Sequence, residues 1–102
     1  MRDAELARLE VARQNALDAV RELGVRVAAT RTEKNRTKKA KLRREGASAS
    51  RLEIALAEYV LATRTYEQAL ADASQAKRKF LALNTQYRDK RAESKIAEAK
   101  RQ

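Results

Sequence analysis

The chain has 102 residues and a net charge of +10, and it contains no cysteine, histidine or proline. Disulfides, thiolate and imidazole metal sites and the commonest catalytic bases are therefore excluded. Alanine supplies 21 residues, whereas Leu, Ile, Val and Phe together supply only 19. Because alanine favours helix but buries little apolar area, we expect a helical chain whose core needs another chain for completion.

The first predicted helix covers about residues 3–45. Its seam positions follow alternating steps of three and four residues, which is the heptad spacing of a coiled coil. These positions are Leu6, Leu9, Arg13, Ala16, Val20, Leu23 and Val27. Thr30 and Glu33 also match a capping box, so a second interpretation is that this helix stops or kinks near residues 28–30 and starts again.

A basic run ends this helix, with eight cations in fourteen residues. They are Arg31, Lys34, Arg36, Lys38, Lys39, Lys41, Arg43 and Arg44. Residues 31–45 carry a net charge of +6, and residues 76–102 carry another +6. Such blocks are typical of contacts with nucleic-acid phosphates or with an acidic protein surface, and also of a solvated helical face.

The predicted turn covers residues 46–49. Gly46 suits the left-handed end of a helix, and Arg43 and Arg44 precede it, where cations meet the negative end of the helix dipole. Ser50 and Glu53 match a capping box, which predicts that the next helix begins there.

The second predicted helix covers about residues 50–100. Its heptad positions are Leu52, Leu56, Tyr59, Thr63, Tyr66, Leu70, Ala73, Lys77, Phe80, Asn84 and Tyr87. Both patterns are interrupted by polar residues, at Arg13, Lys77 and Asn84.

Two such helices joined by a turn predict an all-α fold, an antiparallel two-helix hairpin that forms one domain. If the chain reverses at residues 46–47, the numbers of facing residues sum to about 93. Lys41 then faces Leu52, and Arg13 faces Phe80. The predicted hairpin seam, the row of residues between the helices, includes Leu6, Leu9, Val20, Leu23, Val27, Tyr66, Leu70, Phe80 and Tyr87.

An apolar segment of the second helix faces the basic run in this register. Lysine stems can cover part of it, but an apolar surface left exposed usually marks an interface. The expected interface residues are Leu52, Ile54, Leu56, Tyr59, Val60 and Leu61. They would pack on a second copy or on a foreign protein, unless helix 1 bends or two hairpins form a four-helix bundle that makes the patch internal.

Catalytic chemistry is not evident in this sequence. Its acids are dispersed, and no phosphate-cradling glycine loop is present, so we expect a non-enzymatic protein without metal, cofactor or small-molecule substrate. No stretch is apolar enough to span a membrane, and no signal peptide is evident, so an intracellular, soluble location or a place within a larger particle is expected. The leading hypothesis is a helical assembly or adaptor protein; the alternative is a nucleic-acid-backbone binder without sequence specificity.

The length and the mid-chain glycine superficially resemble the WXG100 class of secreted helical hairpins. Arg44-Glu45-Gly46 lacks the tryptophan of that class, and Arg91 stands where an acid is expected four residues after Tyr87, so the chain is not assigned to it. In composition the chain is similar to small accessory proteins of phage particles and secretion machines.

Overall fold

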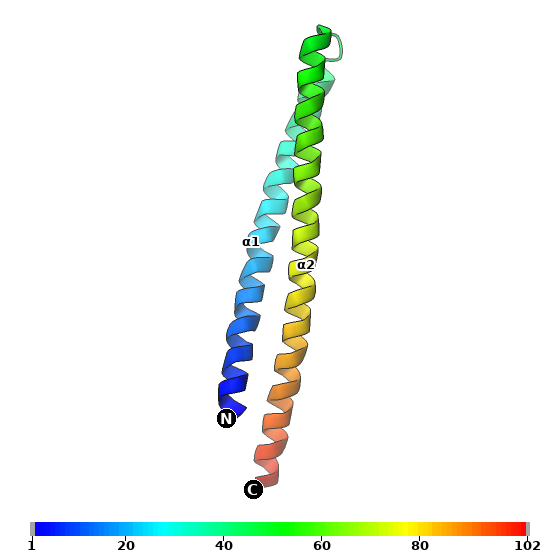
Figure 1. The fold of residues 1–102 in the computed structure, drawn as a ribbon. Helices are drawn as coiled ribbons and strands as arrows, with labels where there is room; N and C mark the ends of the chain where they lie inside the picture. The colour runs from blue at the N-terminus through cyan, green and yellow to red at the C-terminus, as the bar shows by residue number, and fades with distance from the viewer. Residues whose placement is uncertain (1, 102) are drawn as a thin grey trace. The chain divides into compact units, whose positions relative to one another are not determined.

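In a computed structural model the chain forms two helices, α1 (Arg2–Arg43) and α2 (Ala49–Arg101). The structure describes residues 2–101, and the side chains of residues 4–101. The predicted all-α helical hairpin is confirmed, and the described residues contain no strand (Figure 1). Helix α1 is continuous through Thr30, whose hydroxyl donates to the carbonyl oxygens of Arg26 and Val27 at 2.9 and 3.0 Å. This hydroxyl is satisfied inside the helix, so it does not begin a new one.

The end of α1 differs from the predicted left-handed cap. Gly46 does not have a positive φ. The chain leaves the helix through tighter bonds between residues three apart: Arg44 N donates to Lys41 O at 3.1 Å, and Ala47 N donates to Arg44 O at 3.0 Å. Such bonds satisfy terminal carbonyl groups without the backbone freedom of glycine.

The start of α2 also differs from the prediction. The helix begins at Ala49, so Ser50 is already inside it and the predicted capping box with Glu53 does not mark its start. Ser48 stands immediately before the helix, and its carbonyl oxygen accepts a bond from Leu52 N at 3.1 Å. The first intrahelical bond therefore begins two residues earlier than expected.

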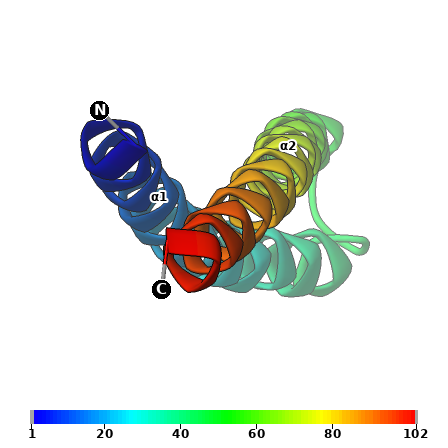
Figure 2. The same ribbon diagram turned by 90° about the horizontal axis from the view of Figure 1, so that it is seen from below.

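Contacts between the helices divide the chain into two compact units. The terminal unit comprises Met1–Glu22 and Ser74–Gln102, and the turn unit comprises Leu23–Ala73. In each unit a segment of α1 runs antiparallel to a segment of α2. Figure 2 views the hairpin from the end that carries both termini, with the start of α1 in blue and the end of α2 in red.

The buried core consists of small side chains. The buried apolar residues are Ala16 in the terminal unit and Ala55, Ala62 and Ala69 in the turn unit, and no large side chain is fully buried among the described residues. The three alanines of α2 recur every seven residues, and Ala69 is 0% exposed. A methyl group that one neighbouring helix covers completely requires the two backbones to lie close together.

This core changes the predicted seam of α2. The structure places every predicted hairpin-seam residue at a half-buried position except Leu70, which is 41% exposed. The sequence pattern placed Leu56, Thr63 and Leu70 in the seam. In the structure the residue before each of them, Ala55, Ala62 or Ala69, is the buried one. Two helices that pack closely have room only for alanine between them. A prediction based on hydrophobicity instead favours a larger apolar residue such as Leu56 or Leu70.

The register also differs from the prediction. Lys41 faces Tyr59 in place of Leu52, and Lys34 faces Tyr66 in place of Tyr59. In the terminal unit Arg13 lies over Tyr87 in place of Phe80. These three contacts are displaced along α2 by seven residues, whereas the hydrogen bonds of Arg13 to Asn84 and of Arg31 to Tyr66 are displaced by four. The start of α2 therefore extends past the last turn of α1 (Figure 1), and a five-residue connection spans that offset.

Candidate partner-binding face

The turn unit has two different sides. On one side a groove of about 230 Å³ lies between the helices. Glu33 and Arg36 of α1 border it, together with Glu58 and Leu61 of α2. The groove side therefore carries both acids and cations along its length.

The acids and cations of the groove side are paired. Arg36 donates two hydrogen bonds to Glu33, at 2.6 and 3.0 Å. The bond from Arg36 lowers the pKa of Glu33 below its ordinary value of 4.5, and Glu33 in turn raises the pKa of Arg36. A second pair on this side joins Arg26 and Asp72 at 3.4 Å. The charge of this side is largely neutralised, which leaves little for a partner to satisfy.

The opposite side, here called the mixed face, combines cations with aromatic rings. Arg31 Nε donates to the hydroxyl of Tyr66 at 3.3 Å, and Lys34 Nζ lies 5.1 Å from the centre of the same ring. Lys41 Nζ lies 5.1 Å from the ring of Tyr59. These contacts hold three cations against half-buried rings by cation–π attraction.

Exposed aliphatic side chains border these rings. Leu56, Val60 and Leu70 of α2 are 37%, 43% and 41% exposed. At 100° per residue, all three lie on the same side of α2 as the outer edges of Tyr59 and Tyr66. On α1, the exposed Leu42 follows Lys38 by four residues and therefore lies on the same side as that lysine. The mixed face consists of Arg31, Lys34, Lys38, Lys41, Leu42, Leu56, Tyr59, Val60, Tyr66 and Leu70, and the exposed Glu67, seven residues after Val60, is an acid on the same side of α2.

The structure divides the interface residues expected from sequence into three groups. Leu52 and Tyr59 are half-buried in the seam. Leu56 and Val60 lie on the mixed face. Leu61, at 67% exposed, borders the groove, and Ile54 shares its side because the two are seven residues apart. Val60 and Leu61 are 100° apart around α2, with Val60 toward the mixed face and Leu61 toward the groove.

The basic run is likewise divided. Arg31, Lys34, Lys38 and Lys41 follow helical spacing along the mixed face, whereas Arg36 lies on the groove side. The remaining three cations, Lys39, Arg43 and Arg44, are exposed.

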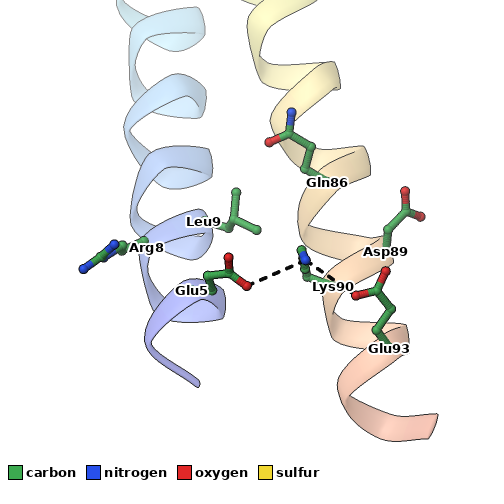
Figure 3. Close-up of a pocket in the computed structure, with 7 residues that line it drawn as sticks. All are labelled: Glu5, Arg8, Leu9, Gln86, Asp89, Lys90 and Glu93. Atoms are coloured by element: carbon green, nitrogen blue, oxygen red, sulfur yellow. Dashed lines mark ion pairs between the residues drawn. The ribbon is translucent and has the colours of Figure 1, made fainter. Parts of the chain in front are cut away.

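The terminal unit contains an ion-pair cluster. Lys90 lies 3.7 Å from Glu5 of α1 and 3.6 Å from Glu93 of α2 (Figure 3). Both carboxylates point toward the ammonium group, whereas Arg8 points away from α2. The adjoining cavity of about 510 Å³ contains both signs of charge. The cluster bridges the two helices through exposed ion pairs, which contribute little stability, and the charges of the cavity lining sum to −1.

The described residues also lack two other kinds of functional feature. No described helix is long and apolar enough to cross a membrane. In the same part of the chain, no three metal-ligating acids lie close together. No family model, curated protein or solved structure matches this chain, so its function has to be inferred from its own residues.

Proposed function

We propose that this protein is a non-enzymatic assembly or adaptor module, a structural component of a larger complex that docks through its mixed face. The observation that carries this proposal is the size of the core: four alanines and Thr37 are the only buried residues among the described side chains. Burial contributes about 25 cal/mol per Å² of apolar area, so a core of methyl groups stabilises a long hairpin weakly. Packing of Leu56 and Val60 against another helix would supply the missing burial.

The chemistry of the mixed face favours a foreign acidic helix as the partner. Its aliphatic residues require an apolar stripe, and its four cations require carboxylates beside that stripe. A second copy fits less well, because it carries the same cations on the same face and a net charge of +10. Face-to-face association of two copies would bring like charges together.

The test is purification of the tagged full-length chain from its native cells after nuclease treatment. Wild type should elute in a complex with a protein, and Leu56→Asp/Val60→Asp should elute as the free chain. The control is Ile54→Asp/Leu61→Asp, which introduces the same two charges on the groove side and should leave the complex intact. A complex that survives Leu56→Asp/Val60→Asp contradicts the proposal.

A second candidate function is sequence-independent binding to a nucleic-acid backbone. It is favoured by the basic run, in which Glu33 with Arg36 is the one ion pair among the described side chains. Replacing Lys34, Lys38 and Lys41 by glutamine should then weaken DNA or RNA binding for all sequences and flatten its dependence on salt. Absence of retention on DNA and RNA at low salt would exclude this function.

A further inference from the structure

A second cavity of the terminal unit is lined by cations without an acid. Its volume is about 470 Å³, and the lining includes Arg13 of α1 and Asn84, Tyr87, Arg88, Arg91 and Lys95 of α2. This composition contrasts with the neighbouring cavity around Lys90, whose lining has three carboxylates and two cations. A site with four positive charges and no counter-charge in its lining is suited to an anionic ligand.

Arg13 lines this cavity and is held by two contacts with α2. It occupies a heptad position where an apolar residue is expected, and it is half-buried. Its guanidinium lies 4.0 Å over the ring of Tyr87, and Nη1 donates to Oδ1 of Asn84 at 3.4 Å. A guanidinium has five N–H donors, so most of them remain for a ligand. The two interruptions of the heptad pattern at Arg13 and Asn84 thus contact each other beside the cavity.

The other three cations follow one side of α2. Arg88, Arg91 and Lys95 are spaced by three and four residues, which places their side chains as neighbours. No ion pair involves Arg13 or any of these three among the side chains that the structure describes. Like charges at this spacing repel one another, and a multiply charged anion would relieve that repulsion.

We propose that this cavity binds the oligophosphate group of a small ligand. Arginine matches phosphate oxygens through paired N–H donors, and three of the four cations are arginines. The three cations that α2 contributes to the cavity occupy only two turns. Leu81 and Asn84 separate them from Lys77, which lies on the same side of α2 seven residues before Asn84, and the acidic Glu98 follows Lys95 by three residues. A nucleic-acid backbone would require a longer basic track, whereas a di- or triphosphate group requires only these two turns.

This proposal is independent of the docking function, because it concerns the terminal unit alone. The test is calorimetric titration of the full-length chain with tripolyphosphate at low ionic strength. Wild type should bind one equivalent, and Arg88→Gln/Arg91→Gln should weaken binding about tenfold or more, since two charge-assisted contacts are lost. The matched control is Arg78→Gln/Lys79→Gln, which removes the same charge from exposed positions on other sides of α2, outside the cavity lining, and should bind as wild type does.

A second readout links the binding to Arg13. In the NMR spectrum of the full-length chain, the Nε–H signal of Arg13 should shift on addition of tripolyphosphate. Circular dichroism should show equal helix content for all three proteins. The proposal is overturned if wild type does not bind, if both double variants weaken binding equally, or if the Arg13 signal does not move. It is also overturned if a short single-stranded DNA binds and both double variants weaken that binding to the same extent, because the charge would then act along the whole helix.

Discussion

The ammonium group of Lys41 lies 5.1 Å from the centre of the Tyr59 ring. In the same unit the Arg31–Tyr66 hydrogen bond is displaced by four residues from the register expected for a reversal at residues 46–47. Tyr59 is seven residues beyond the residue that such a reversal would place opposite Lys41. The same displacement separates Lys34 and Tyr66 from their expected partners. The lysine stems therefore cover two rings, and the aliphatic residues beside those rings remain exposed.

The register can be tested by disulfide formation, because the chain has no natural cysteine. Thr37 and Ala62 are both buried and border the same groove. Thr37→Cys/Ala62→Cys should oxidise readily to an intramolecular disulfide in a glutathione buffer, detected by mass spectrometry. Thr37→Cys/Leu56→Cys, which matches the register expected from sequence, should stay reduced. Preferential oxidation of the second pair would contradict the structure.

The alanine seam predicts a steep penalty for larger side chains. Ala69→Leu should destabilise the hairpin by about 1–3 kcal/mol, because the added atoms have no space between the helices. Ala71→Leu adds the same atoms at an exposed position and should change stability by no more than about 0.5 kcal/mol. Urea unfolding followed by circular dichroism measures both. Equal effects of the two variants would show that α1 does not cover Ala69.

The two glycines predict stabilising substitutions. Gly24 lies inside α1 without a positive φ, and a Cβ atom there would meet no atom within 4 Å. Gly24→Ala should raise the free energy of unfolding by about 0.5–1 kcal/mol, because alanine favours helix and restricts the unfolded chain. Thermal unfolding measures the change. A loss of stability would mean that Gly24 has a contact or a backbone conformation that differs from the structure.

Gly46 should likewise tolerate alanine. It has open space around its Cα and no positive φ, so Gly46→Ala should leave the thermal midpoint unchanged or slightly raised. The left-handed turn that the sequence suggested predicts the opposite sign, because a Cβ atom is strained in that conformation. The direction of the shift therefore separates the two descriptions of the turn.

The helices and the turn could be predicted from the sequence because their causes are local: heptad spacing, abundant alanine and the absence of proline. Each of the predicted heptad positions of α1, from Leu6 to Val27, is at least half-buried. The register could not be predicted, since heptad spacing leaves open how far one helix is offset along the other. The contacts lie from two residues (Glu5 with Lys90) to seven residues (Lys41 with Tyr59) beyond the expected partners. The backbone of residues 44–48 sets this offset, and Gly46 gave a misleading indication of its geometry.

The candidate sites were only partly predictable for a related reason. Val60 and Leu61 belong to one apolar run in the sequence, but the seam at Ala55, Ala62 and Ala69 directs them to different sides. A hydrophobic pattern that favours leucine over alanine misplaces that seam by one residue. Arg13 and Asn84 were visible as interruptions of the heptads. Their contact with each other and with Tyr87 required the register.

Docking of an acidic protein on the mixed face is tested most directly by photo-crosslinking in native cells. Benzoylphenylalanine is placed at Val60 in one sample and at Leu61 in the other, so that neighbouring residues report on the two sides of α2. The docking account predicts that position 60 crosslinks to an acidic helical segment of a foreign protein, that Leu56→Asp abolishes this product, and that position 61 does not form it. Equal products from both positions, or crosslinks from position 60 only to nucleic acid or to a second copy of the chain, would contradict it.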